Sequence, residues 1–538
     1  MFGSRDINLY IYCIKQLNMK KLFSYCLLLT VIFSSCKKTS IESAQQVNEE
    51  LVPTEVIDAF IKKQVATYKK FEWQMASYQM VWSALQHSDN IMSVGYKPAG
   101  LGNVDAYLHT IDVSTSEWKA AKNKVLQMIL ESEQQLDKTV TLDRMVQWEE
   151  NVLPVINITV KSAATVKMLR ESNLVRYAEP MGYEPREAVL NAQQEANNNN
   201  AVASSSGCGS NTAEAGLAEG ADYTTISPAT KQSWNHSYHK VSNAWTKSTG
   251  AGTKVFIIDT GCEFDQENLG SAFNQGASTG RTVEKIVTLP RSTFLGIPTG
   301  PVETADDGCG HGTSMAGACA APRGTDGNAC GIAYNCNLVT CRASEDVFIE
   351  SSREAKGVSD AFTNAANRAD VKIISMSMGR ITSSSQVRDA INYAYGKGKL
   401  IFCAAGTSFS WTSGWYGVIF PATLSNVNAV TGVRDNNFTT TCDDCHDGSE
   451  TDFTIVMEKA SNGRKPLTLA MSGDVPSTVG GSSVATASAA GIAALVWSRF
   501  PGYSRDQVLN KLIQTSANYP TRSGSLGWGN LNADAATN

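Results

Sequence analysis

Three short motifs in this 538-residue chain carry side chains that together could activate a serine hydroxyl. The apolar run Lys254–Asp259 ends in a carboxylate that is followed by Thr and Gly. His311 stands in a glycine-rich stretch before Gly and Thr, and Ser483 follows Gly-Gly-Ser at the start of a run of small residues. A carboxylate that orients an imidazole, which in turn takes the proton of a hydroxyl, forms a nucleophilic triad. Asp, His and Ser occur here in one of the known orders for such a triad.

The residues that follow Ser483 predict a buried helix. Ala485–Ala494 is apolar or small on every face, which is typical of a helix in the middle of a large domain. The free N–H groups and the dipole at its N-terminus favour developing negative charge. A serine in this place is more often a helix cap than a nucleophile, so Ser483 gains its meaning only together with Asp259 and His311.

The three motifs resemble Asp-Thr-Gly, His-Gly-Thr and Gly-Thr-Ser-Met-Ala of the subtilisin-like serine proteases, and the resemblance covers about residues 220–538. It implies a serine endopeptidase that acts on proteins or peptides. Ser483 would attack the peptide carbonyl, His311 would move the proton, and Asp259 would orient the imidazole. The family needs no cofactor for catalysis. It often binds structural calcium, but no loop here has the ligand spacing that would identify a calcium site.

The resemblance also implies where a substrate would bind. An extended peptide would add a strand to an exposed edge. In the family that edge matches Ser377, Met378 and Gly379, and the other wall of the first specificity pocket matches Ala404, Ala405 and Gly406. Small residues at these positions leave the backbone free to pair.

Two positions depart from the family pattern. Thr407 stands where the family has Asn, whose amide donates a hydrogen bond to the oxyanion, and Ala487 stands where Pro is usual. In a protease of this family, loss of that donor costs about 10²–10³ in turnover. A threonine hydroxyl can also donate a hydrogen bond, but the threonine side chain has a shorter reach than that of asparagine. The alternative interpretation is therefore a catalytically weak or inactive subtilase that acts as a binding module.

The same region predicts an α/β fold with a doubly wound, mainly parallel sheet. Apolar strands alternate with helical patterns at 359–369 and 386–395, and such sheets are covered by helices on both faces. Ligands bind at the carboxyl ends of the strands, where Asp259 stands. The predicted strands are Lys254–Asp259, Leu338–Arg342, Val371–Met376, Leu400–Ala404 and Asn428–Val433.

The N-terminus predicts export. Residues 1–36 contain a short positive segment, an apolar run too short to span a bilayer and Cys36, and they resemble a bacterial lipoprotein signal with an upstream extension at 1–18. We expect a precursor anchored by lipid on Cys36 to the periplasmic or cell-surface face of a bacterial envelope membrane, from which a mature catalytic domain can be released. Residues 37–104 are predicted as a tether and a helical segment with amphipathic patterns over 55–86.

Residues 105–185 predict a small α+β domain. Strands are expected at 106–113, 153–160 and 174–178, and helices at 116–131 and 162–172. The closing half resembles subtilase propeptides, which are ferredoxin-like inhibitors of their own protease; an unrelated α+β adaptor domain is the alternative. The polar stretch 186–215 is predicted as a linker with the maturation cleavage, before a catalytic domain at 216–538.

Cysteine and histidine spacing leaves further possibilities open. Ten of the 13 cysteines lie from Cys208 onward, an even number that suggests disulfides of unknown pairing in an oxidising compartment. Cys442-Asp-Asp-Cys445-His446 matches the c-type haem attachment pattern, but a disulfide or loop staple fits this context better than an electron-transfer protein. His236 and His239 are expected as a surface-loop pair rather than as metal ligands.

Composition excludes one class of partner. The chain has 46 basic and 51 acidic residues, and its few short Lys/Arg runs are typical of a solvated surface. Nothing in this balance indicates binding to nucleic acid.

Overall fold

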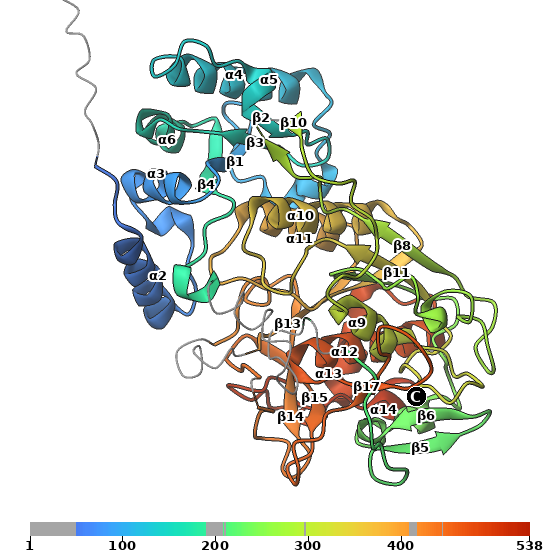
Figure 1. Cartoon of the computed structure of the whole chain (residues 1–538). Helices are drawn as coiled ribbons and strands as arrows, with labels where there is room; N and C mark the ends of the chain where they lie inside the picture. Colours follow the sequence, from blue (N-terminus) through green and yellow to red (C-terminus); the bar gives the residue numbers. More distant parts are fainter. Residues whose placement is uncertain (1–49, 190–207, 209–210, 295–296, 408–416, 444) are drawn as a thin grey trace, which may run out of the picture. The chain divides into compact units, whose positions relative to one another are not determined.

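Seven parallel strands form the central sheet of the chain (Figure 1). The computed structural model describes residues 50–189, 208, 211–294, 297–407, 417–443 and 445–538. The predicted signal peptide with Cys36, the start of the predicted tether and much of the predicted linker lie outside the described residues. Residues 51–538 form one compact unit, in which we distinguish an α+β domain (residues 51–189) and an α/β domain (residues 211–538).

The strand order of the large sheet is β15-β14-β13-β12-β7-β11-β8. The strands are β7 (Lys254–Asp259), β8 (Val283–Val287), β11 (Asn337–Arg342), β12 (Val371–Met376), β13 (Leu400–Ala404), β14 (Asn428–Arg434) and β15 (Thr451–Glu458). The doubly wound parallel sheet and all five predicted strands are confirmed. The sequence did not predict β8, an edge strand that is half-buried along its whole length, or β15, which begins with the polar pair Thr-Asp.

Helices cover both faces of this sheet, as its apolar strands require. Val255 and Ile257 face the core that contains α9 (His311–Ala320) and α12 (Gly481–Arg499). Phe256 and Ile258, which alternate with them, face α10 (Ser352–Asn367) and α11 (Ser385–Gly396). Among the described residues, α12 is the one helix long and apolar enough to cross a membrane, but it is buried inside this core.

The winding of the sheet reverses at β7, because β11 lies on one side of it and β12 on the other. Such a reversal opens a crevice at the carboxyl ends of the strands. Asp259, the last residue of β7, stands at this point. The remaining elements are peripheral: β5 (Tyr223–Ile226), β6 (Thr230–Ser233), η3 (Trp234–Ser237), α8 (Val241–Ala244), η4 (Glu267–Leu269), β9 (Thr293–Phe294), β10 (Ile297–Pro298), β16 (Leu467–Thr468), β17 (Ser477–Thr478), α13 (Arg505–Thr515) and α14 (Ala533–Ala536).

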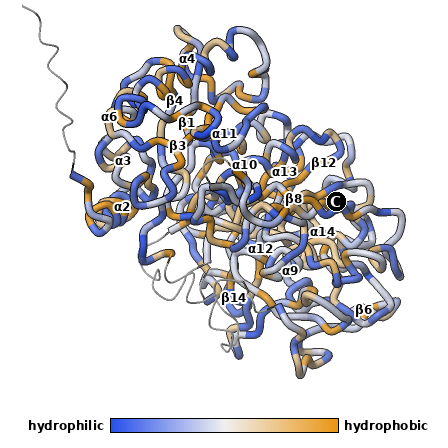
Figure 2. Tube along the Cα trace, turned by 45° about the horizontal axis from the view of Figure 1, so that its top comes forward, coloured by the Kyte–Doolittle hydropathy of each residue, from blue (hydrophilic) through white to orange (hydrophobic). Residues whose placement is uncertain are grey.

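The α+β domain has an antiparallel sheet in the order β2-β3-β1-β4, the ferredoxin-like arrangement. Its elements are α2 (Thr54–Tyr68), η1 (Trp73–Met75), α3 (Tyr78–His87), β1 (Ile91–Tyr96), η2 (Asp105–Thr110), α4 (Ser116–Glu133), α5 (Leu142–Met145), β2 (Val146–Trp148), β3 (Val155–Thr159), α6 (Ala163–Glu171) and β4 (Val175–Pro180). Hydropathy colouring shows the hydrophobic stretches of this sheet in orange (Figure 2).

The strand predicted at 106–113 is wrong. That stretch contains the 3-10 helix η2. The first strand of the sheet is instead β1, which is central in the sheet and buried along its whole length. A strand covered on both faces shows no alternation of polar and apolar residues, so no period-2 pattern marks it in the sequence. Gly95 is needed in β1, because a Cβ atom at this position would lie 2.4 Å from the ring of Tyr177.

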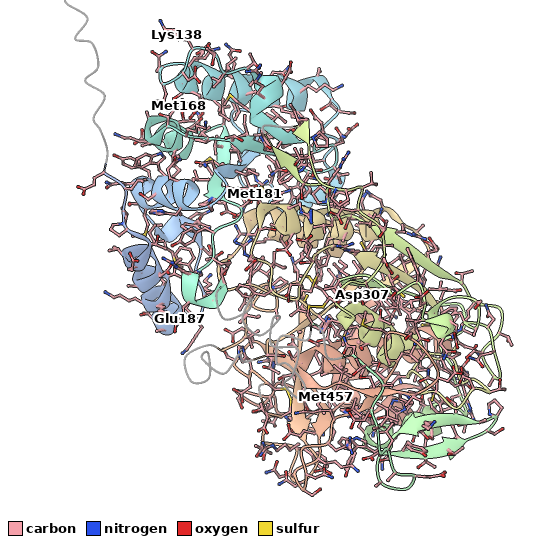
Figure 3. The ribbon with its side chains drawn as sticks, in the orientation of Figure 1. Lys138, Met168, Met181, Glu187, Asp307 and Met457 are labelled. Carbon is pink, nitrogen blue, oxygen red and sulfur yellow. A yellow bond between two sulfur atoms is a disulfide. The ribbon has the colours of Figure 1, made fainter. Side chains whose placement is uncertain are left out.

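The α+β domain docks on α10 and α11 through buried polar contacts. Ser93 in β1 donates to Gln386 at 2.9 Å. Arg176 and Tyr177 in β4 donate to Asp389 at 2.7 and 2.8 Å. Met181, which follows β4, is buried at the same boundary (Figure 3). The two domains therefore share a continuous packed interface rather than being joined by a linker alone.

Candidate active site

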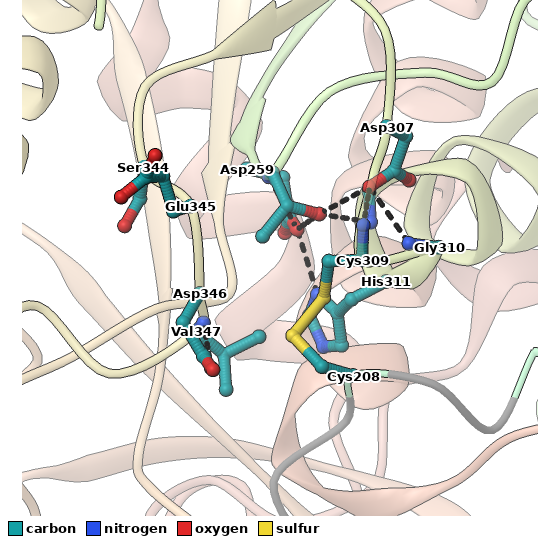
Figure 4. Close-up of a disulfide and its surroundings, with 12 residues drawn as sticks. Cys208, Asp259, Asp307, Cys309, Gly310, His311, Ser344, Glu345, Asp346 and Val347 are labelled. Atoms are coloured by element: carbon teal, nitrogen blue, oxygen red, sulfur yellow. Dashed lines mark hydrogen bonds and ion pairs between the residues drawn. A yellow bond between two sulfur atoms is a disulfide. The ribbon is translucent and has the colours of Figure 1, made fainter. Parts of the chain in front are cut away.

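Asp259 and His311 form a buried hydrogen-bonded pair (Figure 4). β7 delivers Asp259 at the sheet reversal, and His311 is the first residue of α9. Nδ1 of His311 lies 2.7 Å from Oδ1 of Asp259, and His311 is only 2% exposed. Burial lowers the pKa of His311, but the charge and hydrogen bond of Asp259 and the charges of Asp307 and Asp346 outweigh it, so the pKa is raised. The pair can hold one imidazole tautomer and stabilise its charged form.

Asp307, for which the sequence predicted no role, joins the residues that follow Asp259 to those around His311. Its fully buried carboxylate accepts hydrogen bonds from the hydroxyl of Thr260 and the N–H of Gly310 with one oxygen, both at 2.8 Å. Its other oxygen accepts from the N–H and hydroxyl of Thr313 at 2.8 and 2.7 Å. The residues next to Asp259 and around His311 are thereby fixed to one carboxylate. The signal was present in the sequence as a carboxylate four residues before His311.

Ser483 lies in the first turn of α12 and is half-buried. Its hydroxyl lies 3.5 Å from the carbonyl oxygen of Ser377, and the Ser377 hydroxyl donates to the Ser483 carbonyl at 3.0 Å. The structure thus brings Ser483 to the end of β12. Among the described residues, the hydrogen bonds do not include one between Ser483 and His311, and catalytic hydrogen bonds often tighten only when substrate binds.

Thr407 lies beside the residue that precedes Ser483. The Thr407 and Ser482 hydroxyl oxygens are 3.0 Å apart, and Ser482 is fully buried. Gly481 has a positive φ of 76°, and a Cβ atom there would lie 3.2 Å from the Thr407 hydroxyl. The loop after β13 and the start of α12 are therefore in contact, as an oxyanion site between them would require.

The predicted substrate edge at Ser377, Met378 and Gly379 is already paired at Gly379. The N–H of Gly379 donates to the carbonyl of Val347 at 3.1 Å, and its carbonyl accepts from the N–H of Ile349 at 2.9 Å. The expectation that this backbone is free to pair is wrong at Gly379 in this structure. A substrate strand can use these groups only after residues 347–349 have moved away.

Ile419 occupies the gap between the two predicted walls. Ala404 is the last residue of β13 and Ala405 and Gly406 follow it, whereas Gly379 follows β12. A Cβ atom on Gly379 would lie 2.5 Å from the side chain of Ile419, and one on Gly406 would lie 3.0 Å from it. An isoleucine that touches both glycines leaves little room between the walls. No sequence motif marks Ile419, so its place in this gap could not be predicted from the sequence.

The charge of Asp346 also acts on His311, and both residues lie in the surroundings of the Cys208–Cys309 disulfide (Figure 4). Burial raises the pKa of Asp346 to about 6, although N–H groups of Val347 and Phe348 and the charge of His311 lower it. His311 is thus faced by three carboxylates, those of Asp259, Asp307 and Asp346.

Two disulfides form among the ten cysteines from Cys208 onward. Cys208 pairs with Cys309, two residues before His311, and Cys442 pairs with Cys445. The predicted linker is therefore fastened beside the Asp259–His311 pair, and within the Cys442–His446 motif the two cysteines are bonded to each other. The six others are buried without a disulfide: Cys262, Cys319, Cys330, Cys336, Cys341 and Cys403.

The prediction that His236 and His239 lie in a surface loop is wrong, because both are buried. His239 accepts from the N–H of Val456 at 2.9 Å and bonds the carbonyl of Leu531 at 2.8 Å, which joins the C-terminal segment to β15. Burial lowers the pKa of His239 to about 4. Among the described residues, no group of three or more His, Cys, Asp or Glu side chains is arranged to hold a metal ion.

Comparison with known proteins points to one family. The model of the subtilase family (Peptidase S8) matches residues 250–529, just over half of the chain. Alkaline elastase YaB of Bacillus sp. (strain YaB) is 28% identical over 289 residues, 54% of this chain and 65% of the elastase, which is less than two thirds of its length. Subtilisin DY of Bacillus licheniformis is 30% identical over 295 residues, 53% of this chain and 91% of that protein. MycP1 from Mycobacterium smegmatis, a solved structure, is 18% identical with a TM-score of 0.44 and covers 59% of this chain and 88% of its own.

Proposed function

This chain belongs to the subtilase family, and we propose that it is a serine endopeptidase that uses Asp259, His311 and Ser483 as its triad. The observation that carries the proposal is the buried pair of Asp259 and His311, with a 2.7 Å hydrogen bond at the reversal point of the sheet. A histidine that serves only packing has no need of a carboxylate partner and of a second carboxylate, Asp307, that fixes both loops.

Each of the three side chains has one task in the proposed reaction. Ser483 attacks the carbonyl carbon of the peptide bond while His311 takes its proton, and the proton then passes to the leaving amine. Asp259 holds Nδ1–H of His311, so that Nε2 is the nitrogen that accepts the proton. The start of α12 stabilises the oxyanion, and Thr407, whose hydroxyl contacts Ser482, lies next to it as a weaker second donor.

We also propose that the α+β domain is the propeptide of this protease. Its ferredoxin-like strand order and its docking on α10 and α11 support this role. Maturation would cut the stretch 186–215. Lipidation of Cys36 would anchor the exported precursor to the bacterial envelope, and cutting would let the catalytic domain leave the anchor. The partners would be protein or peptide substrates and the protein's own propeptide.

A binding module without turnover is the second candidate. It is favoured by Thr407 in place of asparagine and by the pairing of Gly379 with residues 347–349, which leaves the substrate edge closed in this structure. The two candidates differ in one measurable property, because only the enzyme turns over peptide bonds.

Incubation of the purified full chain with a peptide library, with products read by mass spectrometry, tests the proposal. Cleaved products that disappear in the Ser483→Ala variant support the endopeptidase. Peptides that bind to the chain but stay intact would support the binding module instead.

A further inference from the structure

The α/β domain covers its own substrate edge with a short stretch of chain, residues 346–349, which we call the covering segment. It runs beside Gly379 as a strand would, with hydrogen bonds from Gly379 N–H to Val347 O at 3.1 Å and from Ile349 N–H to Gly379 O at 2.9 Å. These are the backbone groups that an extended peptide would use to join the edge. The covering segment and a substrate strand therefore compete for one place.

Glu354, in the first turn of α10, fastens both ends of the covering segment. One oxygen of its buried carboxylate accepts from the hydroxyl of Ser344 at 2.9 Å, before the segment. The other oxygen accepts from the N–H groups of Glu350 and Ser351 at 3.0 and 3.1 Å, after it. A capping carboxylate at a helix N-terminus is a stable anchor. Glu354 thus fixes both ends of the covering segment, so that movement is confined to its middle.

The middle of the covering segment is held by the α+β domain. Phe348 is 4% exposed and belongs to the hydrophobic core of the α+β domain, together with Trp73 and Tyr183. The hydroxyl of Ser352, which follows the covering segment, donates to Asp89 at 3.0 Å. Phe348 contributes its side chain to the other domain's core while its neighbours Val347 and Ile349 pair with Gly379.

The α+β domain also holds the opposite strand. Arg380, which follows Gly379, is fully buried and donates to Glu184 at 2.8 Å and to the carbonyl of Met181 at 2.9 Å. The N–H of Ile381 donates to the same carboxylate at 3.0 Å. Both partners of the closed pairing, the covering segment and the edge, are therefore fastened to one domain.

We propose that the α+β domain inhibits the protease by holding the covering segment on Gly379, in the place of the substrate. This inference rests on the proposed function as an endopeptidase, and it deepens it by naming the inhibiting contact. When the α+β domain is removed, Phe348 loses the core in which it packs, and Arg380 loses its hydrogen-bond partner, the carboxylate of Glu184. A substrate strand can then displace the covering segment while Ser483, His311 and Asp259 stay in place.

Hydrogen exchange of the full chain tests the holding of the segment without any need for activity. All variants carry Ser483→Ala, which prevents self-cleavage. Phe348→Ala removes the anchor, Phe348→Leu keeps an apolar side chain, and Phe438→Ala is a matched control on an exposed phenylalanine (40% exposed) far along the chain. Because Phe348→Ala removes a buried aromatic side chain, we expect it to speed hydrogen exchange at the N–H groups of Ile349 and Gly379 by about tenfold or more. Phe348→Leu and Phe438→Ala should exchange at nearly the rate of the Ser483→Ala chain.

Two kinds of substrate test the inhibition in the active chain. A small ester needs only the serine and its base, whereas an extended tetrapeptide also needs the Gly379 edge. Initial rates are divided by the amount of Ser483 that reacts with a fluorophosphonate probe, and intact mass confirms that the chain is uncut. Phe348→Ala is expected to raise tetrapeptide hydrolysis by about tenfold or more while ester hydrolysis stays unchanged.

The results separate the inference from the proposed function. Unchanged exchange at Ile349 and Gly379, or ester and tetrapeptide rates that rise together, would overturn the inference even when Ser483 is labelled. Faster exchange without labelling of Ser483 in any variant would support the holding of the segment and overturn the proposed function. If Phe348→Ala does not fold, as judged by fast exchange in β7, Ser352→Ala is measured in its place. It removes only the bond to Asp89, and a smaller acceleration supports the inference while none overturns it.

Discussion

The hydroxyl oxygen of Thr407 lies 3.0 Å from the hydroxyl oxygen of Ser482, the residue directly before Ser483. Either hydroxyl can be the donor. Because Ser482 is fully buried and Thr407 is β-branched with a stiff χ1, this contact restricts where the Thr407 hydroxyl can point. A hydroxyl engaged with Ser482 is a poorer oxyanion donor than a free amide at the same position.

Thr407→Asn is therefore expected to raise kcat about tenfold or more with little change in KM, which corresponds to about 1.4 kcal/mol of added transition-state stabilisation. A donor aimed at the oxyanion forms its strongest hydrogen bond once negative charge has developed in the transition state, so the substitution changes kcat rather than KM. Steady-state kinetics on one good peptide measures it, and Thr407→Val serves as the matched variant without any donor. An unchanged kcat in folded Thr407→Asn would mean that another group already stabilises the oxyanion.

Asp307 is expected to set the pH dependence through His311. The base must be neutral, so kcat/KM rises with pH as His311 loses its proton, and the raised pKa puts this acid limb above the usual 6.5. Asp307→Asn removes one of the three negative charges that raise this pKa, the others being Asp259 and Asp346. We expect the limb to move to lower pH.

Asp307→Asn also places an amide NH₂ among hydrogen-bond donors, and we expect about 1–3 kcal/mol of lost stability from the broken bonds. Thr313→Val is the control, because it removes a hydrogen bond to Asp307 without changing charge. It should lower activity and leave the midpoint of the acid limb in place. A limb that stays fixed in Asp307→Asn would show that the charge of Asp307 does not act on His311.

Local patterns in the sequence were enough to predict the scaffold of the site. The apolar strand that ends at Asp259 and the small-residue helix after Ser483 are visible in consecutive residues, and the order of the motifs connected them with His311. What could not be predicted are contacts between distant residues, such as Cys208 with Cys309 and Val347 with Gly379. They depend on how loops fold back on the sheet, which no periodicity records.

Ile419 is expected to restrict the residue that precedes the scissile bond. Its side chain fills the space between Gly379 and Gly406, so small residues such as alanine should be preferred there. Ile419→Gly should raise kcat/KM for a peptide with phenylalanine or leucine at this position by about tenfold or more relative to alanine, since the apolar side chain gains a pocket. Ile419→Val is the matched control with a small effect. Equal preferences in all three proteins would contradict this account of the pocket.

The Cys208–Cys309 disulfide is expected to stabilise the α/β domain. It spans 101 residues, and a loop of that length is expected to add about 2–4 kcal/mol to the free energy of unfolding. The Cys208→Ser, Cys309→Ser double variant, made in the Ser483→Ala chain, should lose this amount in chemical denaturation. The double variant of Cys442 and Cys445, which spans 3 residues, is the control and should lose less. An equal loss in both would argue against an effect of loop length.

Ser483 is, in our proposal, a nucleophile activated by His311 and Asp259. Fluorophosphonate labelling of the purified full chain, with the modified residue located by peptide mass spectrometry, tests it most directly. We expect a label on Ser483 and none on its neighbour Ser482. It also predicts loss of labelling by about 10³-fold or more in His311→Ala, with little further loss when Asp259→Ala is added, because triad members act as a unit. A chain that labels Ser483 equally fast without His311, or that carries the label on another serine, would contradict the claim.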